Sequence, residues 1–367
     1  MGAPGPWPGE GNWRVGGDGL EPCSGFARTV ACEGWGVAMR IVLCYPVAER
    51  HRQQIAAAAP AAELCDAGQD RIADEILRAD VFIGHAKVPV PWERVVAQGR
   101  LRWIQSSAAG MDHCLVPSVI ASEILVTSAS GLFADQVAEQ TLAMVLAHIR
   151  SLPTFFRAQQ QREFVRRPTD DLHAKTVGII GFGGNGRRIA EVLAPFRTRI
   201  LATDLFPADR PSWVAELWPA DRLDDLLAAS DVVILCLPLN AATEGLIDRE
   251  RLAQMRADSL LVNVARGPVV VEDDLIAALQ AGTLAGAALD VTQVEPLPPG
   301  SPLWDLPNVI ITPHVGAQSA RRIDATTDLA CENLRRYQEG RALQNLVDKQ
   351  LGFPVPVTAA PRCDADR

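Results

Sequence analysis

The chain has 367 residues, 48% of them hydrophobic and 22% charged, with a formal net charge of −9. This length allows two domains with ordinary globular cores, and the acidic balance argues against nucleic acid as a partner. The eight cysteines show no metal-ligand spacing and the apolar runs are too short to cross a bilayer, so we expect reduced thiols, no metal site and a cytoplasmic protein without membrane contact.

The first part of the chain predicts an α/β unit. Residues 1–38 are rich in Gly and Pro without periodicity, so we predict a disordered extension that ends where Met39 opens the first strand. Apolar runs then alternate with helical patterns, which favours parallel βαβ units. Strands are predicted over residues 40–45, 80–84, 102–106 and 124–128, and helices over 48–59, 69–78 and 91–98.

A long helical pattern over residues 135–150 separates this unit from a second α/β series. A final helix over residues 319–339 follows that series, and the Pro-containing segment 349–367 is predicted to be a loose tail. The second series has predicted strands at 176–180, 199–203, 231–237, 259–264, 285–290 and 309–312, and predicted helices at 184–196, 248–255 and 272–281.

The turn after the first strand of the second series carries the pattern Gly181-x-Gly183-x-x-Gly186. It follows a β-branched run and opens a helix, and Asp204 ends the next strand 18 residues after the last glycine. This arrangement is typical of a turn that holds a dinucleotide pyrophosphate at a helix N-terminus. An acid at Asp204 would accept the ribose hydroxyls and repel a 2′-phosphate, which favours NAD over NADP. The plainer alternatives are a tight turn without ligand and a surface or capping acid.

Three further strands of this series are followed by residues that suit hydride transfer. Arg266 follows the strand at 259–264, Glu295 comes shortly after the strand at 285–290, and His314 follows the strand at 309–312. Arginine can grip a carboxylate and polarise a carbonyl, histidine can exchange the hydroxyl proton, and a carboxylate can orient that imidazole. Each alone is easily a surface residue; together, at one sheet edge, they predict a dehydrogenase site.

The sequence closely resembles the D-isomer-specific 2-hydroxyacid dehydrogenase family from about Met39 to Asp348. The motifs in this order are highly specific. They are Gly178-Ile-Ile-Gly-Phe-Gly-Gly-Asn-Gly-Arg187, Leu235-Cys-Leu-Pro-Leu239, Val262-Asn-Val-Ala-Arg-Gly267, Ala287-Ala-Leu-Asp-Val291, Glu295-Pro-Leu-Pro298 and Asn308-Val-Ile-Ile-Thr-Pro-His-Val-Gly316.

The resemblance implies a role for each matching residue. The family's catalytic Arg, Glu and His match Arg266, Glu295 and His314, and its substrate loop matches residues 107–112. There the backbone amides of Ala109 and Gly110 would bind the substrate carboxylate, with Arg266 and Lys87 as further substrate-binding residues. Asp290 matches the acid that contacts the nicotinamide carboxamide. The implied cofactor-binding residues are Gly181, Gly183, Asn185, Gly186, Asp204, Pro238, Val264, Ala265, Arg266, Asp290, His314 and Gly316.

The family also implies a domain organisation. A Rossmann NAD-binding domain, residues 134–316, would be inserted into a smaller flavodoxin-like α/β substrate domain made of residues 39–133 and 317–348. The cleft between the domains would close about the two crossings. A homodimer formed around the helix at 135–150 is implied as well; an ordinary interdomain helix is the alternative for that segment.

The identity of the 2-hydroxy acid stays open. Lys87 could meet a distal phosphate or carboxylate, or be a surface lysine, and relatives that oxidise formate carry Gln where Glu295 stands. Glyoxylate or hydroxypyruvate reduction and 3-phosphoglycerate oxidation both remain, and the physiological direction is open. A second class of function is an NAD(H)-sensing regulator like the transcriptional corepressors of this fold, which also keep the three catalytic residues.

Overall fold

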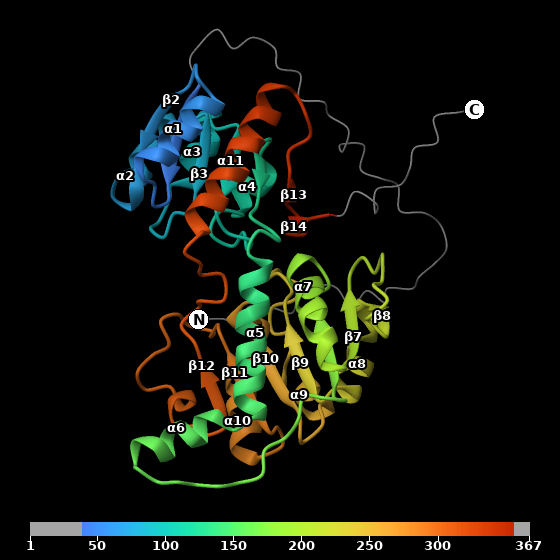
Figure 1. The fold of residues 1–367 in the computed structure, drawn as a ribbon. Coiled ribbons are helices and arrows are strands. Elements are labelled where there is room, and N and C mark those ends of the chain that lie inside the picture. The colour runs from blue at the N-terminus through green and yellow to red at the C-terminus, as the bar shows by residue number, and fades with distance from the viewer. Residues whose placement is uncertain (1–38, 356–367) are drawn as a thin grey trace, which may run out of the picture.

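The computed structural model describes residues 39–355, which form two parallel β-sheets and a short antiparallel pair (Figure 1). The predicted extension at 1–38 and the end of the predicted tail, 356–367, lie outside the described residues. Each parallel sheet carries a separate apolar cluster on either face, so the α/β fold class is confirmed. Within residues 39–355, every helix is too short or too polar to span a bilayer.

The first sheet has five parallel strands in the order β2-β1-β3-β4-β5. Four of the five match predicted strands. The strand β2 was missed because its Glu-Leu-Cys-Asp segment at the sheet edge is only partly buried and shows no apolar run. The strands are β1 Arg40–Cys44, β2 Glu63–Asp66, β3 Val81–Gly84, β4 Trp103–Ser106 and β5 Leu125–Thr127.

The last long helix of the chain returns to this first sheet. Helix α11, Arg322–Gln338, packs beside α1, Glu49–Ala58, and shares an apolar cluster with β1 and β4 (Figure 1). The rings of Trp103 and Tyr337 stack at 5.3 Å within this cluster. Complete burial of a large apolar side chain contributes about 1.5–3 kcal/mol, so this contact holds α11 against the first sheet. The other helices of this part are α2 Gly68–Glu75, α3 Trp92–Gln98 and α4 Pro117–Ala121.

The second sheet has seven parallel strands in the order β12-β11-β10-β9-β6-β7-β8. The chain runs outward from β6 in one direction and then restarts at β9 on the other side, which makes a switch point between β6 and β9. Ligands of such sheets bind outside the carboxyl ends of the strands at this point. The strands are β6 Thr176–Ile180, β7 Arg199–Asp204, β8 Glu216–Pro219, β9 Val232–Leu235, β10 Leu260–Asn263, β11 Gly286–Leu289 and β12 Val309–Ile311.

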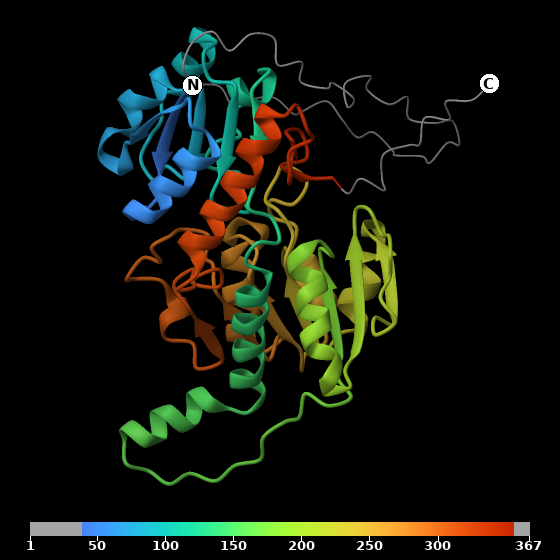
Figure 2. The ribbon, with the colours of Figure 1, turned by 45° about the horizontal axis from the view of Figure 1, so that its top comes forward.

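Helices cover both faces of the second sheet, and one helix lies apart from it. Helix α6, Leu152–Gln160, projects from the body of the protein at the far end of α5, Ala134–Ile149, as the turned view in Figure 2 shows. The sequence did not predict α6, β8 or α8. The remaining helices are α7 Gly184–Leu193, α8 Leu223–Ala229, α9 Arg249–Gln254 and α10 Glu272–Ala281.

The structure differs from the sequence prediction at the end of one helix and in the predicted tail. The helix expected over 184–196 ends at Leu193 because Ala194-Pro-Phe196 tightens into a 3₁₀ turn. The first part of the expected loose tail is regular: β13, Val347–Asp348, pairs with β14, Phe353–Pro354. Just before it, the Asn345 side-chain amide donates to the carbonyls of Ser128 and Ser130, at 3.2 and 2.9 Å, which fastens this segment to the chain ahead of α5.

Candidate functional site

The glycine turn after β6 fits a dinucleotide. Gly181 has φ +91°, and a Cβ at Gly186 would overlap the Gly181 carbonyl, so neither position accepts a side chain without rearrangement. A Cβ at Gly183 would meet only open space, which leaves the backbone approachable from that side. Helix α7 starts there without a side-chain cap, so the N–H groups of its first turn remain available to phosphate oxygens.

The carboxylate of Asp204 is fixed beside this turn. Its Oδ2 accepts the backbone N–H of Phe182 at 2.6 Å, and its Oδ1 accepts that of Phe206 at 2.8 Å. Each carboxylate oxygen can accept a further hydrogen bond. The remaining residues expected at the cofactor lie along the same sheet edge: Asn185 in the first turn of α7, Pro238 after β9, and Val264 and Ala265 after β10.

His314 and Glu295 are in contact, as the sequence predicts. The Nδ1 of His314 lies 2.8 Å from the Oε2 of Glu295, and both side chains are half exposed. His314 itself has φ +54°, a backbone conformation that non-glycine residues rarely adopt. Its N–H donates to the Asp290 carbonyl at 2.7 Å, which helps to hold it there. Such strained residues are frequent at functional sites.

The buried side chain of Asp290 organises the loop that carries His314. Its Oδ1 accepts the Thr312 hydroxyl at 2.6 Å and the Val315 N–H at 3.0 Å, while its Oδ2 accepts the Gly316 N–H at 2.8 Å. A Cβ at Gly316 would lie 2.8 Å from that same Oδ2, so this position needs glycine. All three hydrogen bonds are made within the protein, and contact of Asp290 with a carboxamide stays a prediction.

Arg266 is lodged between the two sheets. Its terminal nitrogen donates to the Ala265 carbonyl at 2.8 Å, its Nε lies 3.2 Å from Asp112, and a Cβ at Gly110 would overlap its guanidinium. Burial raises the pKa of the Asp112 carboxyl, but the charge of Arg266 and the hydrogen bonds to Asp112 outweigh burial and hold this pKa below its usual value. The Asn263 side-chain amide stabilises the turn after β10 by donating to the Arg266 carbonyl at 3.0 Å.

The predicted substrate loop presents free backbone donors next to Arg266. The Ser106 hydroxyl accepts the Ala108 N–H at 3.0 Å and so turns the loop. Within the described residues, the N–H groups of Ala109 and Gly110 have no protein acceptor. Two free amides beside a guanidinium form a set of donors suited to a carboxylate.

Lys87 lies in the loop after β3, and a second side chain holds that loop. The Gln69 amide accepts the Lys87 N–H at 2.7 Å and donates to the His85 carbonyl at 2.9 Å, while the Lys87 side chain is exposed. The structure does not place the Lys87 side chain in contact with Arg266 or with the loop at 107–112, so its role at the substrate stays a prediction.

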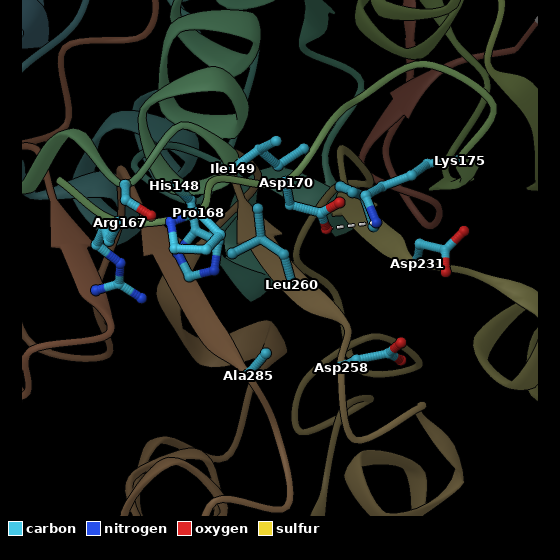
Figure 3. A pocket seen from close by; sticks show the side chains of 12 residues that line it. His148, Ile149, Arg167, Pro168, Asp170, Lys175, Asp231, Asp258, Leu260 and Ala285 are labelled. Carbon is cyan, nitrogen blue, oxygen red and sulfur yellow. Dashed lines mark ion pairs between the residues drawn. The ribbon is translucent and has the colours of Figure 1, made fainter.

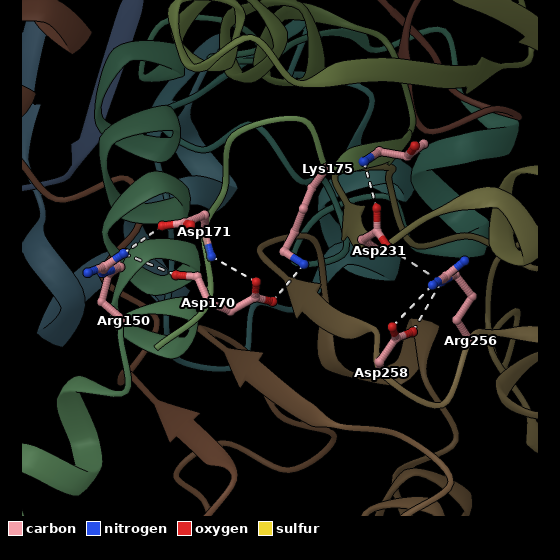
Figure 4. Close-up of polar contacts among 8 residues, drawn as sticks. Arg150, Asp170, Asp171, Lys175, Asp231, Arg256 and Asp258 are labelled. Carbon is pink, nitrogen blue, oxygen red and sulfur yellow. Dashed lines mark hydrogen bonds and ion pairs between the residues drawn. The ribbon is translucent and has the colours of Figure 1, made fainter. Parts of the chain in front are cut away.

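A cavity of about 250 Å³ lies elsewhere, at the amino ends of the second sheet's strands (Figure 3). Among the charged side chains that line it, Lys175 lies 2.6 Å from Asp170, while Asp258 and Asp231 lie 3.1 and 3.4 Å from Arg256 (Figure 4). Arg167 lines the cavity as well. Because this is the edge opposite the glycine turn, we regard it as a structural feature of the domain.

The sequence did not predict the contacts that three residues of the site make. Asp112 pairs with Arg266 across 154 positions of sequence, Asn263 fixes the turn below Arg266, and Thr312 bonds to Asp290. Asn263 carried a signal that was not used, because a fully buried amide that ends an apolar strand requires partners. Asp112 and Thr312 carried no local signal of that kind.

Known proteins share this architecture. Residues 142–316 match the family model described as D-isomer specific 2-hydroxyacid dehydrogenase, NAD binding domain. The chain is 35% identical over 263 residues to a glyoxylate reductase from Thermofilum pendens, covering 70% of this chain and 77% of that one. It is 32% identical to a D-3-phosphoglycerate dehydrogenase from Mycobacterium bovis, where the match covers 76% of this chain and only 53% of the longer relative.

A solved structure gives the same result. The D-isomer specific 2-hydroxyacid dehydrogenase from Xanthobacter autotrophicus Py2, in complex with NADPH and MES, superimposes with a TM-score of 0.73 at 30% identity, covering 86% of this chain and all of that one. The chain has the predicted fold class and matches an NAD-binding domain of this family. It therefore belongs to the D-isomer specific 2-hydroxyacid dehydrogenase family.

Proposed function

We propose that this protein transfers a hydride between NAD(H) and C2 of a small D-2-hydroxy acid or the corresponding 2-oxo acid. The observation that carries the proposal is the lodging of Arg266 against Gly110, beside two free amides, at the sheet edge that also bears the His314–Glu295 pair. This edge combines a carboxylate-binding set with an acid/base pair, which is what a 2-oxo acid requires.

Each residue has a distinct role in this proposal. A nicotinamide dinucleotide bound along the glycine turn would supply or accept the hydride. Arg266 binds the substrate carboxylate and polarises the carbonyl oxygen, with the amides of Ala109 and Gly110 on the other side of the carboxylate. His314 donates the proton to that oxygen during reduction and accepts it during oxidation. Glu295 holds the ring through Nδ1 at 2.8 Å, so Nε2 is the nitrogen that faces the substrate.

NAD is the coenzyme that we propose, on the strength of Asp204. Its negative charge at the end of β7 opposes the 2′-phosphate of NADP. The structure of the Xanthobacter autotrophicus relative is a complex with NADPH, so the family includes a member that binds the phosphorylated coenzyme. Residues 39–133 with 317–348 would move as one body and residues 134–316 as the other, and the contact of Arg266 with Asp112 joins the two bodies.

We also propose that the chain acts as a homodimer in the cytoplasm. Around α6 the large apolar side chains of Phe156 and Phe164 are 58% and 90% exposed, next to Leu152 and Val165. Exposed apolar side chains clustered in this way, next to α5, suit burial against a second copy of the chain. The buried thiols Cys44, Cys114 and Cys331 are unpaired, in keeping with a reducing compartment. Light scattering tests this by comparing the mass of the wild type, expected to be that of a dimer, with the masses of Phe156→Glu and Phe164→Glu. Variants with the mass of a monomer support the proposed contact, and variants with the mass of the wild type show that α6 does not form it.

The test of function is oxidation of NADH and NADPH with a panel of 2-oxo acids that includes glyoxylate, hydroxypyruvate and 3-phosphohydroxypyruvate. We expect turnover of at least one of them, with NADH preferred. Tight binding of NADH without turnover of any 2-oxo acid would instead favour the regulatory role.

A further inference from the structure

The segment that leads from β11 to Glu295 holds one carboxylate oxygen of this residue. The Oε2 atom of Glu295 faces Nδ1 of His314, and its Oε1 accepts the backbone N–H of Thr292 at 3.3 Å. The glutamate side chain has several rotatable bonds and is 39% exposed, so contact with His314 alone would leave the plane of its carboxylate free to turn. The N–H of Thr292 is the second contact, which fixes this plane.

The side chain of Thr292 sets the direction of that N–H. Thr292 is only 7% exposed, and its hydroxyl donates to the carbonyl of Val294 at 2.9 Å, which closes a short turn just ahead of Glu295. Threonine hydroxyls stabilise turns of this kind because they bond to backbone groups close by in the sequence. The buried Thr292 side chain therefore helps to determine how the chain presents Glu295.

Two neighbouring segments hold the peptide that joins Thr292 to Gln293. A Cβ at Gly267 would lie 1.8 Å from the Thr292 carbonyl oxygen, so the turn that follows Arg266 packs directly on this peptide. In addition, the N–H of Gln293 donates to the Glu272 carboxylate at 2.9 Å, and the Glu272 N–H, at the start of α10, donates to the Gln293 side chain at 3.4 Å.

The same peptide therefore serves both halves of the proposed site. On one side it packs on the turn that carries Arg266, and on the other its threonine holds the carboxylate that contacts His314. Because the contact at Gly267 is between backbone atoms, it cannot be relieved by the rotation of a side chain. The position of Glu295 is in this way fixed relative to Arg266.

We propose that Thr292 is a positioning residue of the dehydrogenase site, which acts on the reaction through Glu295. Its N–H and the turn that its hydroxyl closes keep the carboxylate of Glu295 directed at Nδ1 of His314, so that Nε2 keeps its orientation while the proton is exchanged. Thr292 itself touches neither substrate nor coenzyme in this proposal. The inference rests on the proposed function and adds to it the residue that holds the acid/base pair in place.

The experiment is a double-mutant cycle between Thr292 and Glu295, in which kcat and KM are measured for NADH oxidation with the best 2-oxo acid. Thr292→Val removes the hydroxyl and keeps the shape of the side chain, and Thr292→Ser keeps the hydroxyl. Glu295→Ala removes the carboxylate, alone and together with Thr292→Val. Thr141→Val is the matched control, because Thr141 is also buried and its hydroxyl donates to a backbone carbonyl within α5, that of Val137, at 2.7 Å.

The melting temperature of each variant checks folding. Glu272→Gln provides a second cycle with Glu295→Ala if Thr292→Val does not fold, because it weakens the support of the same peptide from α10. The pattern expected of the two cycles is the same.

We expect Thr292→Val to lower kcat by about tenfold, which corresponds to the loss of about one hydrogen bond. The KM for the 2-oxo acid and the Kd for NADH should stay within about threefold of the wild type. Thr292→Ser should keep kcat within about threefold, and Thr141→Val should leave it unchanged. In the Glu295→Ala background, Thr292→Val should lower kcat by less than about twofold, because the carboxylate through which Thr292 acts is gone.

An equal loss of kcat on Thr292→Val with and without the Glu295 carboxylate would show that Thr292 does not act through Glu295. A Thr292→Val variant that keeps kcat within about threefold of the wild type, or a Thr292→Ser variant that loses as much as Thr292→Val, would also overturn the inference. All three results leave the proposed function standing. Absence of turnover of every 2-oxo acid by the wild type overturns the proposed function and this inference with it.

Discussion

Substitution of Gly110 by Ala tests the contact between the two halves of the site. A Cβ at Gly110 would overlap the Arg266 guanidinium, and no positive φ at this residue adds strain of its own. An added Cβ would lie 1.6 Å from the nearest guanidinium nitrogen, so that nitrogen must move by roughly 2 Å to reach ordinary van der Waals contact. Because the displaced atoms end a flexible side chain, the move costs little folding free energy.

The functional cost should be much larger. Misplacement of a substrate-positioning group by about 1 Å lowers the rate on the order of 10²-fold, or about 2.7 kcal/mol of transition-state stabilisation. We expect Gly110→Ala to lower kcat/KM for the 2-oxo acid by this amount, with an unchanged Kd for NADH and a melting temperature within about 3 °C of the wild type.

Gly300→Ala is the matched control, because a Cβ there meets nothing within 4 Å. It should behave as the wild type in every assay. If Gly110→Ala keeps kcat/KM within about threefold, Arg266 does not work against this loop and the reasoning about the carboxylate-binding set is wrong.

Three further predictions concern other parts of the site. Asp204→Ser should shift the kcat/KM ratio of NADH to NADPH towards NADPH by about tenfold or more; an unchanged ratio removes Asp204 from the ribose site. Asp290→Asn loses one charged acceptor of the loop that carries His314, so it should lower stability by about 1–3 kcal/mol in urea denaturation and lower kcat as well; stability and kcat both equal to the wild type would contradict this. Burial, with the charge of His85, lowers the pKa of His113 to about 3, so the stability that this neutral histidine contributes is complete above pH 6.5 and is lost as the pH falls towards 3. Between pH 7 and 5 the free energy of unfolding of the wild type should fall by about 2 kcal/mol more than that of His113→Gln. Equal losses in the two proteins would show that His113 does not have this lowered pKa.

The parts of the site that sequence predicted well are those that strand ends and local turns determine. Gly181 and Gly186 lie in one turn whose backbone leaves no space for side chains, so their pattern is visible over a few residues. His314 and Glu295 were placed together because parallel strands deliver their following loops to one edge, and their side chains indeed meet at 2.8 Å.

The features that were missed depend on tertiary contact. Asp112 meets Arg266 only because the loop after β4 of the first sheet packs against the loop after β10 of the second, and no periodicity connects positions 154 residues apart. The edge strand β8, Glu216–Pro219, is partly exposed and therefore lacks the apolar run of a central strand. The pairing of β13 with β14 joins two-residue strands, which are shorter than any pattern can reveal.

The central claim is that His314 exchanges the proton with the substrate oxygen. The direct measurement is kcat for NADH oxidation with the best 2-oxo acid, compared between His314→Gln and His173→Gln, a histidine exposed on the surface. We predict that kcat falls on the order of 10²-fold or more in His314→Gln and stays at the wild-type value in His173→Gln. A His314→Gln variant that turns over within threefold of the wild type would contradict the account.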